Sequence, residues 1–347
     1  MNATPSGAVR AGALLLVPAL LLLFQGGAAT LERKAPAGLA DIEAAVAKAY
    51  EAHKDDQGGK NADYIPYLAE VPSELFAVVV VTVDGKVVAK GDADYGFSIQ
   101  SVSKPFTAAL VMQESGADTI RTKIGVEPTG QPFNSVLAIE TLEARSVNPM
   151  VNAGAMAAVS LVKAEGVQQR YTRIFDWYGR FAGEPLELNE EVCRSEMATN
   201  QRNQGIAALL KAYGRLYADI DETVTVYTQQ CSINVTARQL AVMGATLANG
   251  GVNPVTKQRV LDGKLVPKLL AVMMMAGFYD EAGEWAWTAG VPAKTGVGGG
   301  IVAVVPGRMA IVGFSPRLNQ AGNSVRAAKA IGTIVEELGL NLFGRGR

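Results

Sequence analysis

The position of the strand-forming segments constrains the fold most, because they lie near the two ends of the chain and not in its middle. Residues 75–83 are a β-branched run that stops at Asp84-Gly85, a strong hairpin turn, and residues 86–89 return from it. Toward the other end, three segments have the composition and alternation of strands: 292–295, 300–305 and 308–314. A last helix is expected from about residue 323 to residue 338.

Helical periodicity dominates the long segment between these strands. From residue 106 to about residue 278, almost every periodic segment repeats its apolar residues at helical spacing. Thr236 and Gln239 form a capping box that opens one of these helices, and Gly250-Gly251 closes it. Before the first strand, residues 39–53 predict an amphipathic helix.

These patterns predict an α/β fold. Strands at both ends with helices between them favour one antiparallel sheet that is built from both chain ends, flanked by helices, with an all-helical domain inserted. The sheet part is expected at about residues 35–105 and 280–340, and the helical part at about residues 106–279.

Residues 1–29 have the pattern of a secretory signal peptide. Arg10 supplies a thin positive region, residues 11–24 an apolar stretch, and residues 26–29 small side chains for cleavage. The apolar stretch has about 14 residues, fewer than the roughly 20 that a membrane span needs. We therefore expect a mature chain of residues 30–347 that is periplasmic or secreted and has no stable membrane insertion after cleavage. An uncleaved N-terminal anchor is the alternative.

Charge and histidine content argue against several classes of function. The formal net charge is −1 and no basic block occurs, so a nucleic-acid partner is not expected. The single histidine, His53, lies at the polar end of the predicted first helix. A Ser-His-Asp triad or a multi-histidine metal site would have to use this solvated residue, and no metal or cofactor is predicted. Cys193 and Cys231 are expected to be buried free thiols in helices, with a disulfide between them as the alternative.

The stretch from Phe97 to Phe106 carries the strongest candidate for chemistry. Ser101 and Lys104 are three residues apart, so on a helix they share one face and their side-chain tips can meet. Burial and the positive end of the helix dipole both disfavour an ammonium, so Lys104 can lose its proton near neutral pH. A serine beside such a lysine is an activated nucleophile that needs no histidine. Pro105 requires that this pair lie in the first turn, where a missing N–H is tolerated.

Serine and lysine at this spacing also arise by chance, and the chain has a second copy. Ser160 and Lys163 lie in and just after the apolar run of residues 153–162, far from any predicted helix start. We interpret this copy as a helix-interior serine and a solvated lysine.

Three later stretches add polar groups that can act in a site. Lys294-Thr295-Gly296 ends a predicted strand and precedes glycines that let the backbone approach a ligand closely. Tyr227-Thr228-Gln229 is read as a polar interruption between helices, where the phenol can move a proton. Residues 195–203 are rich in hydrogen-bonding side chains and include Glu196 and Asn203. Each stretch also has a structural alternative. The first can be a glycine-rich turn, the tyrosine of the second can serve only in packing, and the third can be a solvated helix junction.

The order Ser-x-x-Lys, Tyr-x-Gln, Lys-Thr-Gly resembles the serine β-lactamases and penicillin-binding proteins. Within that superfamily the chain is similar to the bacterial serine-dependent glutaminases, whose domain also resembles the catalytic domain of kidney-type glutaminase. The resemblance runs from about Ala35 to Gly339. It rests on five stretches: 62–66, 97–104, 130–135, 148–155 and 289–300.

The resemblance implies an amidohydrolase that converts L-glutamine and water to L-glutamate and ammonia. Ser101 would be the nucleophile that forms the acyl-enzyme and Lys104 its base, and the N–H groups of Ser101 and Val297 would form the oxyanion site. A tyrosine, Tyr227 or Tyr64, would pass a proton to the departing ammonia. The residues that would line the glutamine site are Ser101, Asn152, Glu196, Asn203, Tyr227, Tyr279 and Val297.

Assembly and location follow from the resemblance only in outline. The family implies a homo-oligomer, a dimer or a tetramer, and its bacterial members are commonly cytosolic, which conflicts with the predicted signal peptide. Thr295 stands where the family often has serine, and it keeps the hydroxyl. Two alternatives stay open: a β-lactamase or penicillin-binding-type acyl transferase on the same fold, and a periplasmic glutamine-binding protein that has kept the pocket.

Overall fold

A computed structural model describes residues 37–141 and 146–344 of the chain, and these belong to one compact unit. The predicted signal peptide, residues 1–29, lies outside the described residues. Within the described ranges no helix is both long and apolar enough to cross a membrane.

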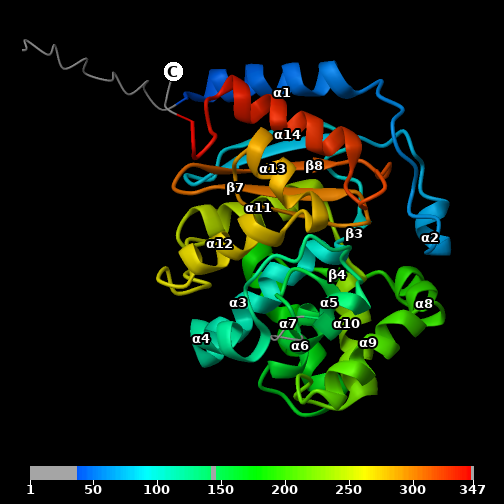
Figure 1. The fold of residues 1–347 in the computed structure, drawn as a ribbon. Coiled ribbons are helices and arrows are strands. Elements are labelled where there is room, and N and C mark those ends of the chain that lie inside the picture. The colour runs from blue at the N-terminus through cyan, green and yellow to red at the C-terminus, as the bar shows by residue number, and fades with distance from the viewer. Residues whose placement is uncertain (1–36, 142–145, 345–347) are drawn as a thin grey trace, which may run out of the picture. The chain divides into compact units, whose positions relative to one another are not determined.

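A five-stranded antiparallel sheet joins the two ends of the described chain (Figure 1). Its strands are β1 (Ala77–Thr82), β2 (Val87–Gly91), β6 (Ala293–Thr295), β7 (Gly300–Val305) and β8 (Met309–Phe314). The order is β2-β1-β8-β7-β6, so the pairing of β1 with β8, in which Ala77 faces Phe314, connects the two halves. The predicted fold class, an antiparallel sheet made from both chain ends, is confirmed.

Helices cover both faces of this sheet, as its fully buried strands β1, β7 and β8 require. The helices α1 (Leu39–His53) and α14 (Val325–Glu337) pack on one face, where Val46 and Ile331 contact the same apolar cluster as Val80. The other face packs on α11 (Ala237–Ala248), and Figure 1 shows the sheet between these two layers. A Cβ added at Gly244 of α11 would lie 2.5 Å from the side chain of Val302, so the absence of a side chain lets this helix sit close.

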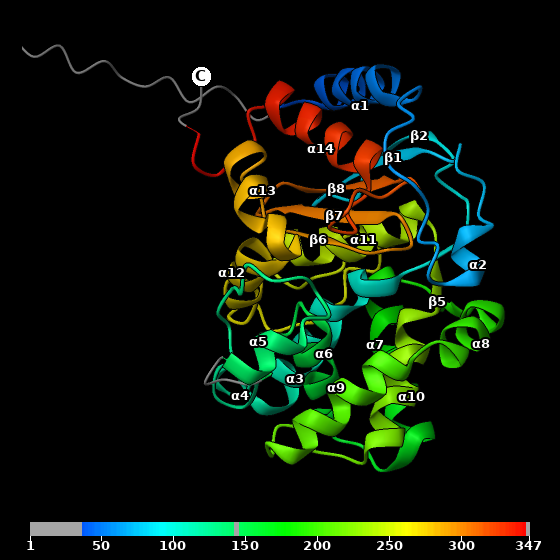
Figure 2. The ribbon, with the colours of Figure 1, turned by 45° about the vertical axis from the view of Figure 1, so that its right-hand side comes forward.

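The helical part lies beyond α11, on the side of the sheet away from α1 (Figure 2). Its long helices are α3 (Lys104–Ser115), α6 (Asn152–Leu161), α7 (Gly166–Ala182), α8 (Glu190–Ala198), α9 (Gln201–Ala212) and α10 (Ile220–Cys231). The remaining helical elements of the described chain are α2 (Pro66–Ala69), α4 (Ala117–Thr119), a π-helix (Ile120–Ile124), α5 (Val136–Thr141), α12 (Val266–Ala276), a 3₁₀-helix (Tyr279–Glu281) and α13 (Ala282–Thr288).

A small second sheet was not predicted from the sequence. Its strands are β3 (Phe97–Ser98), β5 (Ile233–Val235) and β4 (Glu187–Leu188), which pair in that order. Strands of two or three residues are too short to show an alternating pattern. This sheet matters because β3 leads directly into the turn that carries Ser101.

The prediction that Tyr227-Thr228-Gln229 lies between helices is wrong, because all three residues lie inside α10. Two of these side chains have hydrogen-bond partners there, and the Tyr227 hydroxyl donates to Asn152 Oδ1 of α6 at 3.0 Å. The Thr228 hydroxyl donates to the Val224 carbonyl one turn earlier, at 3.0 Å.

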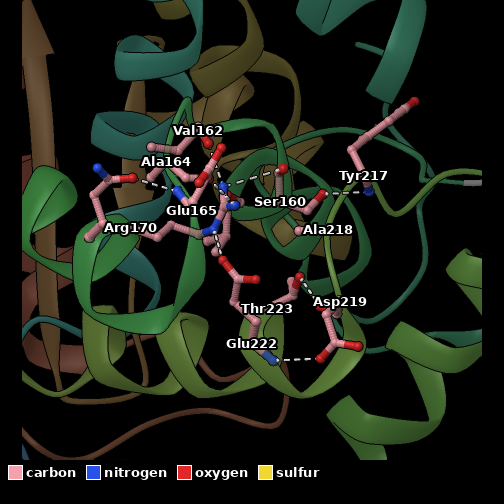
Figure 3. A network of polar contacts seen from close by, with 12 residues as sticks. Ser160, Val162, Ala164, Glu165, Arg170, Tyr217, Ala218, Asp219, Glu222 and Thr223 are labelled. Carbon is pink, nitrogen blue, oxygen red and sulfur yellow. Dashed lines mark hydrogen bonds and ion pairs between the residues drawn. The ribbon is translucent and has the colours of Figure 1, made fainter.

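A buried arginine ties the end of α6 to α7 and α10 (Figure 3). The Arg170 guanidinium donates to the carbonyls of Val162 and of Ala164, the latter at 2.7 Å, and pairs with Glu222 at 2.7 Å. It thereby satisfies carbonyls that a helix end and the turn after it leave free. The Ser160 hydroxyl donates to the Ala157 carbonyl at 2.7 Å, so the second Ser-x-x-Lys copy has the structural role that we predicted for its serine.

Both cysteines are free thiols in helices. Cys231 of α10 is buried, as predicted, but Cys193 of α8 is only partly buried, and that part of the prediction is wrong. Its helix packs on the rest of the molecule chiefly through α2 and α10, which leaves one side of it open to solvent.

Candidate active site

Ser101 and Lys104 meet at the start of α3. A 3₁₀ turn (Gln100–Ser103) follows β3 and runs into α3, and Pro105 lies in the first turn of that helix. The Lys104 Nζ atom lies 2.5 Å from Ser101 Oγ, and the two residues are 1% and 6% exposed. The sequence-based pairing of these two side chains is therefore present in the structure.

Burial changes the acid strength of Lys104. The pKa of its ammonium is lowered to about 8, chiefly because desolvation penalises the charged form. The nearby Cys231 and Glu196 act in the opposite direction. A lysine with this pKa has a substantial free-amine fraction near neutral pH, which a general base needs.

Asn152 connects this pair to two other helices. Its Oδ1 atom accepts hydrogen bonds from Lys104 Nζ at 2.9 Å and from the Tyr227 hydroxyl at 3.0 Å. Its Nδ2 atom donates to Asn203 Oδ1 at 3.0 Å. Asn152 starts α6, Tyr227 belongs to α10 and Asn203 to α9, so three predicted site residues from separate helices meet at Asn152, beside Lys104.

Glu196 lies on α8 and is held by a residue to which the sequence analysis gave no role. Gln100 Nε2 donates to the Glu196 carboxylate and, at 3.2 Å, to Ser98 Oγ. Desolvation raises the pKa of Glu196 to about 7, and the bond from Gln100 and the charge of Lys104 oppose this rise. Gln100 has a φ of 50°, which is unusual for a residue other than glycine. Its position directly before Ser101 was the only sequence signal for it.

The opposite wall comes from the C-terminal half of the sheet. The turn after β6 carries Val297, which is buried, and a Cβ added at Gly298 would lie 2.4 Å from the Ser98 carbonyl oxygen. Glycine therefore lets this turn lie directly against the segment before Ser101. The close approach of this backbone to a ligand, which the Lys-Thr-Gly stretch predicts, stays a prediction. The Tyr279 hydroxyl donates to the Thr295 carbonyl at 3.3 Å. Burial raises the pKa of Tyr279, while a hydrogen bond with Ser101 acts against that rise.

Tyr64 lies at the rim of this group. Desolvation, and then the nearby charge of Glu196, raise the pKa of its phenol, although 53% of the residue is exposed. Burial raises the pKa of Tyr227 as well. Both phenols are thus neutral proton donors at neutral pH.

The remaining polar candidates lie elsewhere. His53 ends α1 on the other face of the sheet, and its Nε2 atom lies 2.9 Å from the Thr333 hydroxyl of α14. In the parts of the chain that the structure describes, no group of three or more His, Cys, Asp or Glu side chains could hold a metal ion. The arrangement as a whole brings together a serine hydroxyl, a buried amine, one carboxylate and several neutral hydrogen-bonding groups.

Comparisons with known proteins identify the family of this chain. The family model described as Glutaminase matches residues 59–343. The chain is 52% identical over 304 residues to a glutaminase of Mycobacterium ulcerans, covering 88% of this chain and 95% of that protein. It is 51% identical over 302 residues to a glutaminase of Brucella canis, with 87% and 95% covered.

Solved structures agree with the sequence comparisons. The probable glutaminase YbaS has a TM-score of 0.87 and 48% identity to this chain, covering 88% of this chain and 99% of its own. Mglu in its glutamate form has a TM-score of 0.83 and 37% identity, with 87% and 70% covered. With most of its length matched in sequence and in structure, the chain belongs to the glutaminase family.

Proposed function

We propose that this glutaminase converts L-glutamine and water to L-glutamate and ammonia through an acyl-enzyme on Ser101. The observation that carries the proposal is the contact between Lys104 Nζ and Ser101 Oγ, 2.5 Å apart and both buried. The lowered pKa of Lys104 supports its role as the base. The glutamate form of the similar protein Mglu is consistent with a site for the product.

The acylation step starts with a proton transfer. Lys104 takes the hydroxyl proton as Ser101 Oγ attacks the side-chain amide carbon, and the amide oxygen becomes an oxyanion. The N–H groups of Ser101 and Val297 stabilise that charge, and each such donor is worth about 3 kcal/mol. The C–N bond then breaks, the amide nitrogen takes a proton from Tyr227 or Tyr64, and ammonia leaves. Lys104 returns its proton to the tyrosine.

Deacylation reverses the roles. Water gives a proton to Lys104 and attacks the ester carbon, the bond to Ser101 Oγ breaks, and the serine regains a proton from Lys104. The released γ-carboxylic acid gives its proton to the ammonia, so the products are glutamate, ammonium and free enzyme, and atoms and charges balance over the two steps.

Recognition of a free amino acid needs one anion and several neutral donors. Glu196 supplies the carboxylate that pairs with the α-ammonium of glutamine, and Gln100 holds it in place through the bond to its carboxylate. The neutral side chains that meet the α-carboxylate are Asn152, Asn203 and Tyr279.

The direct test is ammonia release from glutamine by the mature protein and by Ser101→Ala. We expect release by the first only, and no opening of a chromogenic cephalosporin by either protein. Mass spectrometry of acid-quenched enzyme should show a γ-glutamyl adduct on the peptide that contains Ser101. Turnover by Ser101→Ala would contradict the proposal.

We also propose that the signal peptide is removed and that the mature enzyme works in the periplasm or outside the cell as a dimer or tetramer. The support is the pattern of residues 1–29 and the family resemblance. N-terminal sequencing of protein from the native host should find a start near Thr30, and light scattering should give the mass of an oligomer. Intact Met1 in the cytosolic fraction would contradict the export proposal.

A further inference from the structure

Lys294 is a buried amine for which the proposed mechanism has no role. It lies on β6 and is 0% exposed. Its Nζ atom donates to the carbonyls of Thr295 at 2.7 Å and of Gly277 at 3.1 Å, and it lies 4.0 Å from the centroid of the Tyr279 ring. A buried amine is expensive unless such partners compensate it, so its retention calls for a reason.

Each of the three contacts of Lys294 is with Tyr279 itself, with a group that Tyr279 also contacts, or with a residue close to it in the chain. Thr295 offers one carbonyl oxygen to both Lys294 Nζ and the Tyr279 hydroxyl. Gly277 lies two residues before the tyrosine, and a Cβ added there would lie 1.8 Å from the Ala293 carbonyl oxygen. Lys294 therefore fastens the segment that carries Tyr279 onto β6.

Tyr279 needs such fastening. Its φ is 58°, a left-handed backbone conformation that an aromatic residue adopts only when its surroundings hold it. The ring also packs against Phe133, with centroids 5.0 Å apart. Its hydroxyl is shared between the Thr295 carbonyl and Ser101, so a small rotation of the ring would remove the phenol from the nucleophile.

We propose that Lys294 is a positioning residue that holds the ring of Tyr279 so that its phenol meets Ser101, and that it does not bind the substrate. The proposal rests on the proposed acyl-enzyme function, in which Ser101 is the nucleophile, and on the hydrogen bond between Tyr279 and Ser101. The complete burial of Lys294 and its two carbonyl partners favour this role over recognition of a substrate carboxylate. Burial also lowers the pKa of its ammonium, which weakens it as an anion-binding group.

A double-mutant cycle tests the proposal. Lys294→Met, Tyr279→Phe and the double variant are compared in kcat/KM for ammonia release from glutamine. We expect Lys294→Met to lose about 10²-fold, as misplaced catalytic geometry does. The double variant should be within about threefold of the slower single variant, because both changes remove the same function. Losses that multiply would overturn the proposal.

Arg170→Met is the matched control. Arg170, like Lys294, is a buried basic residue that donates to backbone carbonyls, but its partners lie at the C-terminal end of α6. If its loss merely weakens the fold, its effect should multiply with that of Tyr279→Phe. The wild type and Ser101→Ala are assayed alongside, so that the two proposals can fail separately. Turnover by Ser101→Ala would contradict the acyl-enzyme mechanism. Losses that multiply for Lys294→Met and Tyr279→Phe would contradict only the positioning role of Lys294.

Chemical rescue supplies a second measurement that does not depend on Lys294→Met folding well. Lys294→Ala leaves a space for n-propylammonium, and n-propanol is the matched uncharged additive. We expect the amine to restore kcat/KM by about tenfold in Lys294→Ala and to have no effect in the Lys294→Ala/Tyr279→Phe variant. Rescue that does not need Tyr279, or equal rescue by the alcohol, would show that Lys294 acts in some other way.

Discussion

Oδ1 of Asn152 accepts a hydrogen bond from Lys104 Nζ at 2.9 Å, so the amine that faces the Ser101 hydroxyl is held by a neutral group. A carboxylate at this distance would stabilise the ammonium and raise its pKa. The amide keeps the lysine in place without that effect, and burial is left to lower the pKa to about 8.

Asn152→Asp tests this relationship. The new carboxylate should raise the pKa of Lys104 by about one unit or more, so the rising limb of the pH profile of kcat/KM should move to higher pH. Asn203→Asp is the matched control, because Asn203 bonds to Asn152 and not to Lys104. Asn203→Asp should shift the rising limb of the pH profile less than Asn152→Asp does. An unchanged limb in folded Asn152→Asp would show that Lys104 is not the titrating base.

The pH profile of the wild type should have two ionisations on its acid side. Lys104 must be a free amine and Glu196 a carboxylate, and their pKa values are about 8 and about 7. As the pH falls, kcat/KM should drop about tenfold per unit below pH 8 and more steeply below pH 7. The two groups influence each other, so the apparent values belong to the pair. Glu196→Gln should leave a single-slope limb, and an unchanged double slope would contradict these assignments.

Ser101→Ala should lower kcat by about 10⁴-fold or more, and Lys104→Ala by about 10²- to 10⁴-fold. His53→Ala should keep most of the activity, since His53 contacts Thr333 on the other face of the sheet. Circular dichroism and melting curves establish that the three variants are folded. Complete loss in folded His53→Ala would exclude a lysine base acting alone.

Much of the fold could be predicted because its signals are local. The β-branched run before Asp84-Gly85 and the strands after residue 292 predicted the antiparallel sheet, and the capping box at Thr236 opens α11 as expected. The pairing of β3 with β5 could not be predicted, since Phe97 and Val235 are far apart in sequence and each strand is too short for a periodic signal.

Some contacts of the site could likewise be predicted from local sequence, and others depend on tertiary packing. Ser101 and Lys104 are neighbours along one turn, so their contact follows from spacing. Gln100 meets Glu196 from 96 positions away, and only because its backbone is left-handed, which no local pattern predicts. Lys294 was found as part of a Lys-Thr-Gly motif, but its contact with Tyr279 depends on how β6 packs against residues 277–279.

The buried pair of Arg170 and Glu222 makes a prediction about stability. Arg170→Met leaves Glu222 and the carbonyls at the end of α6 without their partner, so unfolding should become about 3–5 kcal/mol easier. Arg121→Met is the control, because Arg121 and its partner Asp118 are both exposed, and its cost should be at most about 1 kcal/mol. Urea unfolding measures both, and equal costs would contradict the structural role of the buried pair.

The last prediction concerns the amino end of the substrate. Glu196 is the carboxylate that the structure places beside Gln100, near Lys104 and Tyr64, so it is the group able to balance an α-ammonium. Its removal should leave a partly desolvated cation unpaired, a loss of roughly 3–5 kcal/mol in kcat/KM. Because the chemistry at the amide end stays in place, Glu196→Gln should lose activity mainly through binding.

A cycle of two enzymes and two substrates measures this contact. Wild type and Glu196→Gln are each assayed with glutamine and with an analogue that lacks the α-amino group. In Glu196→Gln the analogue should lose little further activity, because its missing charge no longer has a partner. Asn203→Ala is the control, since Asn203 is assigned to the α-carboxylate and its loss should add to that of the amino group. If the two losses at Glu196 also add, its carboxylate does not contact the ammonium, and its bond with Gln100 must then serve to hold the turn before Ser101.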